Sequence, residues 1–387
     1  MHDGLAPSGE YGQPREPTRL LGPIGKAILD MSLVSTRRKT RSLCVGTVKV
    51  GGDAPVSVQS MCNTKTEDVA ATVAQIHRLE EVGCEIVRVA VPTQQAAEAI
   101  SSIKKEIHIP LVADIHFDHR LAIAAAENGA DALRINPGNI GSREKVEKVV
   151  ACAKERQLPI RIGVNAGSLS QEILDRFNGV SPEAMVASAM ENIKILEALD
   201  FFDIKISLKA SDVYRTVAAY RLLSQRVDYP LHVGVTEAGS LFPGVVKSSI
   251  GIGMLLSEGI GDTIRVSLTR DPVEEIRVGQ EILKSLELRR FGPEIVSCPT
   301  CGRCNIDLFS IVETVENTLI GCTTPVKIAI MGCVVNGPGE AREADIGIAG
   351  GHGIGILFKK GEVVKKFPEG QLVEVLLEAI KEFESRG

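Results

Sequence analysis

The chain of 387 residues contains no tryptophan, and aromatic residues make up only 4% of it. Proteins that hold single-stranded nucleic acid stack the bases on aromatic side chains, so this chain is poorly supplied for that task. Positive charge does not prevail either, because 44 basic residues stand against 49 acidic ones and give a net charge of −5. We therefore expect no nucleic-acid partner.

The sequence also lacks long apolar runs. No stretch approaches the roughly 18 apolar residues that a membrane-spanning helix needs, and no apolar segment with a cleavage site lies near the start. We therefore expect no membrane partner and a cytoplasmic location. In that reducing compartment the nine cysteines, an odd number, are thiols or metal ligands rather than disulfides. Four of them lie in apolar or mixed runs typical of ordinary thiols, namely Cys44, Cys62, Cys84 and Cys152.

The other five cysteines gather in one segment near the C-terminus. They are Cys298, Cys301, Cys304, Cys322 and Cys333. The first three stand three residues apart in SCPTCGRC, and the last follows an apolar run in IAIMGCVVNGPGE. Thiolates this close in sequence converge on one metal centre with little loop-closure entropy. Spacing alone leaves both zinc and an iron–sulfur cluster open, and it makes the three closely spaced cysteines the most obvious ligand set.

Between about residues 50 and 290, short β-branched runs alternate with longer amphipathic stretches. The strand candidates are VSVQSMC, EIVRVAVP, LVADIHF, ALRINPG, IRIGVNAG, DIKISLKAS, LHVGVTEAG and TIRVSLT. Eight strands separated by helices over about 240 residues match a (β/α)8 TIM barrel, whereas a doubly wound sheet, the alternative, normally has fewer repeats. We predict an α/β fold with a flexible tail over residues 1–34, rich in Gly, Pro and charge, and a TIM barrel over residues 35–292.

Five of these strands carry cations between apolar neighbours. Because side chains alternate along a strand, the cations project to one side of the sheet, and they are Arg88, Arg134, Arg161, Lys205, Lys209 and Arg265. Burying unpaired cations costs several kcal/mol each, so either acids or an anionic ligand must neutralise them. Only Asp114 and Glu237 stand near the carboxyl ends of strands. The excess of cations predicts a multiply charged anion such as a diphosphate, and an internal salt-bridge layer is the alternative.

Residues 293–387 follow a different, α+β pattern. It consists of the helix IDLFSIVETVENTL, the strands KIAIMGC and ADIGIAGG, the hairpin GILFKKGEVVKKF and the helix QLVEVLLEAIKEFE. A unit of this size is near the minimum for its own core, so a metal centre would help it fold. The stretch GGHGIG resembles a dinucleotide fingerprint, but it precedes a hairpin rather than a helix, and we interpret it as a turn.

In combination, SCPTCGR and MGCVVNGPGEA, joined to a barrel with ADIHF, LRINPGN, RIGVN and VTEAG, resemble a known family. It is the bacterial 4-hydroxy-3-methylbut-2-enyl diphosphate synthase family of the non-mevalonate isoprenoid pathway, and the resemblance covers essentially everything after the tail. It implies a TIM barrel followed by a [4Fe–4S] domain. The implied activity is that of an oxidoreductase that opens and dehydrates 2-C-methyl-D-erythritol 2,4-cyclodiphosphate with two electrons.

The resemblance also implies site residues, position by position. The implied cluster ligands are Cys298, Cys301, Cys333 and the carboxylate of Glu340. A carboxylate oxygen is a poorer match for iron than a soft thiolate, and it could give way to a substrate oxygen. Glu237 is the implied acid or base of the dehydration, and a closed, partly dry site would raise its pKa. The implied substrate contacts are Arg88, Asp114, Arg134, Arg161, Lys209, Arg265, Ser267 and Asn336.

Two other functions stay open. A zinc-stabilised binding protein would use the cysteines as a structural knuckle. A radical S-adenosylmethionine enzyme would also join a barrel to a cluster, but its cysteines usually lie near the start of the barrel. The family pattern does not require a cysteine at position 304, so we interpret Cys304, like Cys322, as a thiol outside the ligand set.

The link between the two predicted domains is short, at Phe291, Gly292 and Pro293. A cluster domain on such a link reaches its own barrel poorly, which favours capping the barrel of a second subunit. The resemblance implies such a homodimer, with closure upon substrate binding. Because the sequence has no convincing flavin or nicotinamide motif, we expect an external one-electron donor, ferredoxin or flavodoxin as the resemblance implies.

Overall fold

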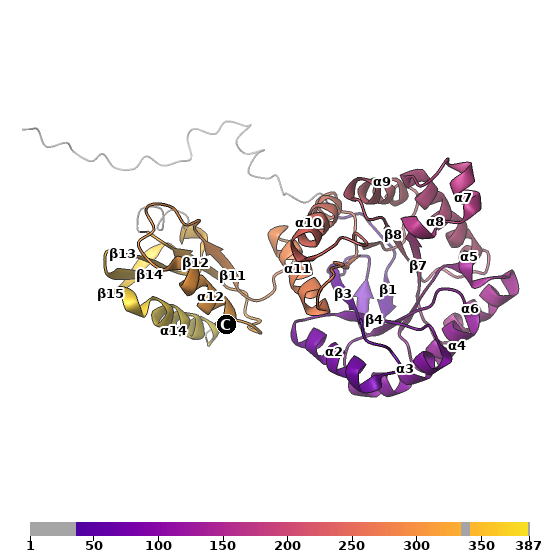
Figure 1. Cartoon of the computed structure of the whole chain (residues 1–387), viewed down its shortest axis with the longest axis horizontal. Coiled ribbons are helices and arrows are strands. Elements are labelled where there is room, and N and C mark those ends of the chain that lie inside the picture. The colour runs from indigo at the N-terminus through magenta and orange to yellow at the C-terminus, as the bar shows by residue number, and fades with distance from the viewer. Residues whose placement is uncertain (1–35, 334–340, 386–387) are drawn as a thin grey trace, which may run out of the picture.

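The eight predicted strands form one parallel barrel in a computed structural model that describes residues 36–333 and 341–385. The predicted tail over residues 1–34 lies outside these residues. The strands are β3 (Ser57–Met61), β4 (Ile86–Ala90), β5 (Leu111–Asp114), β6 (Ala132–Ile135), β7 (Ile160–Asn165), β8 (Ile204–Lys209), β9 (His232–Val233) and β10 (Thr263–Ile264). Their order is β8-β7-β6-β5-β4-β3-β10-β9, and a parallel bridge between Ile206 and Leu231 closes the ring. The predicted TIM barrel is confirmed (Figure 1).

Helices surround the ring of strands (Figure 1). They are α2 (Val69–Glu81), α3 (Gln94–Glu106), α4 (His119–Glu127), α5 (Pro137–Ile140), α6 (Arg143–Glu155), the 3₁₀ turn η2 (Ala166–Ser168), α7 (Gln171–Arg176), α8 (Pro182–Glu197), α9 (Val213–Ser224), α10 (Leu241–Ser257) and α11 (Pro272–Ser285). Several begin at a side chain that accepts a hydrogen bond from the first turn, as Asp212 does from the backbone of Arg215 at α9. None of the helices in the described part of the chain is long and apolar enough to cross a membrane.

The alternation along each strand separates the apolar core from the lumen. On β7, Ile160, Ile162 and Val164 are buried in the apolar core cluster that includes residues of the surrounding helices. The intervening residues, Arg161 and Gly163, face the other way, into the ring. The side chains of the neighbouring strands alternate in the same way, and their inward-facing polar side chains line the lumen.

A short hairpin, which the sequence did not lead us to expect, covers the amino end of the barrel. It consists of β1 (Leu43–Val45) and β2 (Val48–Val50), which pair antiparallel. Its apolar residues form a small core with Ile86, Val112 and Ala132, near the amino ends of β4, β5 and β6. Only the carboxyl ends of the strands are therefore left for a ligand, as in other barrels of this type.

The C-terminal residues form a second, five-stranded sheet. Its elements are β11 (Glu294–Ser297), α12 (Leu308–Thr318), β12 (Lys327–Met331), the 3₁₀ turn η3 (Ala341–Glu343), β13 (Ile346–Gly351), β14 (Ile354–Lys359), β15 (Glu362–Pro368), the 3₁₀ turn η4 (Glu369–Gln371) and α14 (Leu372–Glu384). Strands β11 to β13 are parallel, and β14 and β15 form the predicted hairpin. The glycine-rich stretch is a turn between β13 and β14, where His352 and Gly353 have φ values of 57° and 81°. In Figure 1 this sheet lies beside the barrel, next to α11, and not across the ring of strands.

Candidate active site

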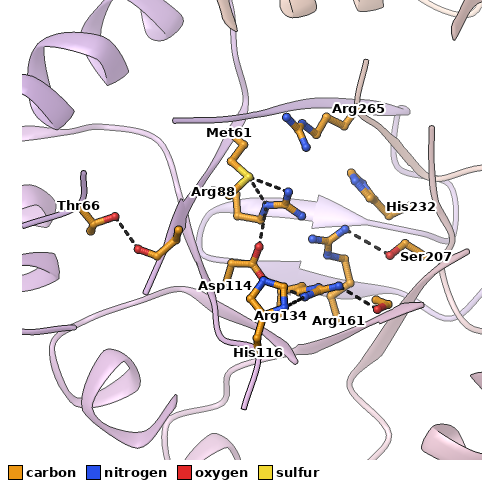
Figure 2. A network of polar contacts seen from close by, with 12 residues as sticks. Met61, Thr66, Arg88, Asp114, His116, Arg134, Arg161, Ser207, His232 and Arg265 are labelled. Atoms are coloured by element: carbon orange, nitrogen blue, oxygen red, sulfur yellow. Dashed lines mark hydrogen bonds and ion pairs between the residues drawn. The ribbon is translucent and has the colours of Figure 1, made fainter. Parts of the chain in front are cut away.

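The cations predicted from the strand pattern converge inside the barrel. Figure 2 shows Arg88, Arg134, Arg161 and Arg265 directed into the lumen from four different strand positions. Arg134, Arg161 and Lys209 are buried, and the side chains of Arg88 and Arg265 are mostly covered. Lys205 lies opposite Arg161 in the register of β7 and β8 and is also buried. The structure thus brings together all six lumen cations that the sequence singled out.

Asp114 is one of two carboxylates that form ion pairs with these cations within the described residues. Its Oδ1 lies 3.1 Å from Arg134 Nη1, and its Oδ2 lies 3.5 Å from Arg88 Nε. Burial raises the pKa of Asp114, but Arg88, Arg134 and Arg161 outweigh burial and leave that pKa below its usual value. Asp114 is therefore a permanent anion that holds two arginines in place.

The second carboxylate is Glu275 on α11, which the sequence analysis did not select. It lies 3.4 Å from the guanidinium of Arg265 and accepts hydrogen bonds from Ser60 Oγ at 2.9 Å and from the backbone of Leu268 at 3.0 Å. Glu275 is buried, and its ion pair holds the guanidinium of Arg265 in place. A signal was present in the sequence, since Glu275 shares one helix face with the buried residues Gly279 and Leu283.

The remaining lumen cations have few partners among the described residues. Arg161 is 2% exposed, and its Nη1 lies 3.4 Å from Ser207 Oγ. The described residues offer no hydrogen-bond acceptor to its Nε and Nη2, or to the Nζ of Lys205. Burial, together with Arg88 and Arg134, places the pKa of Arg161 well below its usual value. An internal salt-bridge layer does not account for this arrangement, because within the described residues only Asp114 and Glu275 form ion pairs with the lumen cations. A third buried carboxylate, Asp262, attracts Lys205 but forms its ion pair with Arg37 at 3.0 Å.

Anion binding to this site should be coupled to proton uptake. Burial and the neighbouring Arg161 lower the pKa of Lys205 to about 7, and burial and Arg265 place that of Lys209 well below its usual value. A bound phosphate favours the charged forms and raises both pKa values, so affinity should fall as pH rises above neutral. Calorimetry at about pH 7.5 in buffers of different ionisation enthalpy should report uptake of about one proton. A binding enthalpy independent of the buffer would contradict this.

Arg134 depends on a glycine opposite it. Its Nη2 donates to the carbonyl of Gly163 at 2.9 Å, and a Cβ at position 163 would lie only 2.3 Å from Arg134 Nε. Gly163→Ala should therefore displace the guanidinium and weaken ligand binding by about 10-fold or more, with little change in melting temperature. Gly167→Ala is the matched control, because a Cβ there meets nothing within 4 Å. Equal affinities of the two variants would show that the position of Arg134 is unimportant.

Two predicted residues lie nearer the open end. Ser267 follows β10 and is half-buried, and Glu237 follows β9 and is exposed. Glu237 has a φ of 51°, a left-handed conformation that costs energy for a residue other than glycine. The closed, dry surroundings expected for Glu237 are thus not formed by the barrel of this chain alone. Asn336, the last predicted substrate contact, lies outside the described residues.

Two of the predicted cluster cysteines follow the carboxyl ends of neighbouring strands. Cys298 directly follows β11, Cys333 comes two residues after β12, and these strands pair in parallel. The backbone N–H of Gly332 donates to Cys298 Sγ at 3.2 Å. Cys301 is exposed, and a hydrogen bond from the backbone of Arg303 helps to lower its pKa, which favours the thiolate that metals bind. The donor type and the strand positions fit a thiolate-bound iron centre.

The complete ligand set is not assembled within the described residues. Within the described residues, 36–333 and 341–385, no group of three or more cysteine, histidine or carboxylate side chains is close enough to hold a metal ion. Glu340 lies outside this part of the chain. Cys304 Sγ and Cys298 Sγ both border Gly332, where a Cβ would lie 2.5 Å and 3.5 Å from them, so Cys304 lies near the site. Cys322 Sγ instead contacts Glu384 of α14 at 2.9 Å.

A parallel barrel with an excess of buried cations in its lumen, followed by a sheet that presents thiols at its strand ends, defines a two-domain barrel enzyme for an anionic substrate. Residues 40–280 match the GcpE TIM-barrel domain, and residues 294–382 match the GcpE protein C-terminal domain. The chain belongs to the GcpE family. The resemblance inferred from its motifs is thereby confirmed.

Curated relatives agree with this assignment over nearly their full length. A protein of Geobacter sulfurreducens, named 4-hydroxy-3-methylbut-2-en-1-yl diphosphate synthase (flavodoxin), is 60% identical over 345 residues, which are 89% of this chain and 98% of the relative. A protein of Clostridium perfringens with the same name is 60% identical over 345 residues, 89% of this chain and 99% of the relative.

Proposed function

We propose that the chain converts 2-C-methyl-D-erythritol 2,4-cyclodiphosphate into 4-hydroxy-3-methylbut-2-enyl diphosphate. The reaction consumes two electrons and two protons and releases one water, so the chain is an oxidoreductase, in agreement with the names of its relatives. The observation that carries the proposal is the buried guanidinium of Arg161, two of whose nitrogens have no acceptor among the described residues, in a lumen where cations outnumber carboxylates. A diphosphate supplies the missing negative charge.

The roles of the barrel residues follow from their positions. Arg88, Arg134, Arg161, Lys209 and Arg265 hold the diphosphate, with the arginines giving paired hydrogen bonds and the lysine a point charge. Asp114 orients Arg88 and Arg134 and contacts the substrate beside them. Ser267 and Asn336 add polar contacts. Since Asp114 and Glu275 hold three of the arginines in place before the substrate arrives, binding to those arginines costs little reorganisation.

Glu237 is the proposed proton donor or acceptor of the dehydration. It stands at the open end of the barrel, where a second domain can cover it. Cover by that domain would remove water from around the carboxyl group, so that a proton passes between this group and the substrate rather than the solvent. The exposure of Glu237 in the uncovered barrel is consistent with a site that is completed by closure.

Cys298, Cys301, Cys333 and Glu340 are the proposed ligands of a [4Fe–4S] cluster. The three thiolates anchor the cluster at the strand ends, and the carboxylate is the exchangeable ligand. Such a cluster transfers electrons one at a time and offers a Lewis-acidic iron to an oxygen ligand. The proposed division into a barrel over residues 35–292 and a cluster domain over 293–387 places these groups on a body that can move relative to the barrel.

The electron donor is external to the chain. The relatives' names include flavodoxin, and we propose flavodoxin or ferredoxin as the donor of this chain.

We further propose that the protein is a homodimer. Helix α10 carries exposed apolar side chains at every fourth position, and its one charged residue is Lys247. The exposed residues at this spacing are Phe242, Val246, Ile250 and Met254, with Phe242 81% exposed. An apolar stripe of this kind is typical of a subunit interface. Because the cluster domain lies beside its own barrel (Figure 1), a partner subunit is the natural source of cover for each active site.

The test is an anaerobic turnover assay with the cyclic diphosphate and a strong one-electron reductant, combined with iron and sulfide analysis. We expect brown protein with about four iron and four sulfide per chain, and formation of the open-chain diphosphate. Colourless protein that contains zinc and no sulfide would favour the zinc-stabilised binding protein. Activity that requires S-adenosylmethionine would favour the radical enzyme.

A further inference from the structure

A buried histidine contacts the one lysine among the proposed phosphate ligands. His232 on β9 is 0% exposed, and its Nε2 lies 3.4 Å from Lys209 Nζ. The other ring nitrogen, Nδ1, is hydrogen-bonded to Thr263 Oγ1 on β10. Figure 2 shows the ring on the lumen side, between Arg265 and Ser207. Neither the sequence motifs nor the substrate contacts proposed above include His232.

The two contacts define the protonation state of the ring. When Lys209 carries its proton, as it does with an anion bound, its ammonium has no lone pair and can only donate, so Nε2 must then carry a lone pair. The single ring proton of a neutral imidazole is therefore on Nδ1, where it is donated to Thr263 Oγ1. The basic groups that act on the ring are Lys209, which contacts it, and also Arg161, Lys205 and Arg88. Together with burial they place the pKa of His232 well below its usual value, so the ring stays neutral.

The side chain of Tyr220 links the backbone segments that carry Lys209 and His232. Tyr220 on α9 is buried, and its hydroxyl donates to the carbonyl of His232 and accepts from the backbone N–H of Leu208 at 3.0 Å. Leu208 directly precedes Lys209, so the phenol joins the two strands that carry the lysine and the histidine. Gly234, which directly follows β9, leaves space for the lysine, because a Cβ there would lie 2.9 Å from Lys209 Nζ.

We propose that His232 is a positioning residue that directs the Lys209 ammonium toward the diphosphate. Its Nε2 is the one hydrogen-bond acceptor that the described residues offer to Lys209 Nζ. Because the acceptor is neutral, it orients the ammonium without cancelling the charge that the phosphate requires. The inference rests on the proposed phosphate-binding role of Lys209 and adds a residue that acts through it.

Two substitutions distinguish the contribution of Nε2, which contacts Lys209, from that of Nδ1, which contacts Thr263. Glutamine places its amide near the position of Nε2 and keeps an acceptor for Lys209, whereas asparagine reaches only the position of Nδ1 and keeps the contact with Thr263. We expect His232→Asn to weaken binding of the cyclic diphosphate to the anaerobically purified full-length protein by about 10-fold. His232→Gln should recover most of that affinity. His77→Asn, on α2 outside the barrel, is the matched control and should bind normally.

A double mutant tests whether the effect passes through the lysine. In a Lys209→Met background, His232→Asn should cause no further loss of affinity. The proposal is overturned if His232→Asn and His232→Gln bind equally, or if the full 10-fold loss persists without Lys209. Melting temperatures of all variants identify any loss due to misfolding.

A spectroscopic readout decides the question independently of substrate. In protein with ¹⁵N-labelled histidine, at a pH low enough for Lys209 to carry its proton, Nε2 of His232 should show the chemical shift of an unprotonated nitrogen. Lys209→Met should move that shift, whereas Lys39→Met on the exterior should not. A proton on Nε2, or no response to Lys209→Met, overturns the inference. If the wild-type protein fails to bind the cyclic diphosphate at all, the proposed function fails, and this spectrum still decides the role of His232.

Discussion

Arg161→Met should make the protein more stable while it lowers the affinity for the cyclic diphosphate by at least about 100-fold. Two of the guanidinium nitrogens have no acceptor among the described residues, and the side chain is buried beside other cations. Methionine removes that electrostatic penalty and fills a similar volume, so the free energy of unfolding should rise by about 1–3 kcal/mol. Calorimetric unfolding and substrate titration measure the two effects.

The control for Arg161 is Arg221→Met, which removes an exposed arginine paired with Glu258 on the outside of the barrel. Both stability and affinity should change little there. A strong destabilisation by Arg161→Met would mean that the guanidinium is satisfied within the protein. Unchanged affinity would mean that the substrate does not reach the lumen.

A mixture of two inactive variants should recover activity if active sites are shared between subunits. Glu237→Ala damages only the barrel half of the site, and Cys333→Ser damages only the cluster half, so each variant alone should lose nearly all turnover. A dimer with one subunit of each kind contains one intact combination, and an equal mixture should reach about one quarter of wild-type activity after subunit exchange. No recovery, with exchange verified by mass spectrometry, would place each site within one chain.

The interface predicted on α10 supplies a control for the mixing experiment. Ile250→Glu introduces a charge into the apolar stripe without touching either half of the site. In that background the mixture should stay inactive because the mixed dimer does not form. Full recovery despite the substitution would place the interface elsewhere.

Much of the barrel was predictable because its signals are local. Each strand is a β-branched run of period two, and the cations of that pattern all face the lumen. The hairpin of β1 and β2 was missed since its three-residue strands are too short to establish a period, and only the turn at Gly46 marks them. Strand β11 was missed because its four residues lead directly into the cysteine motif.

The site was predicted less completely than the fold because it depends on long-range contacts. Glu274 and Glu275 are neighbours in sequence, yet Glu274 pairs with Arg277 near the surface while Glu275 holds Arg265 inside. His232 lies at an inward position of its strand, but only the structure pairs it with Lys209. The strand pattern correctly indicated an excess of lumen cations but missed two buried acids, Glu275 and Asp262. The assigned roles of the cations, of Glu237 and of the cysteines stay predictions.

The central claim is that the lumen recognises the phosphates of its substrate. Calorimetric titration of the anaerobic full-length protein tests it most directly, with the cyclic diphosphate compared against the same methylerythritol skeleton without phosphates. We predict binding of the cyclic diphosphate at micromolar concentrations, weakened by salt, and no measurable binding of the free polyol. Equal binding of both, or of neither, would contradict the account.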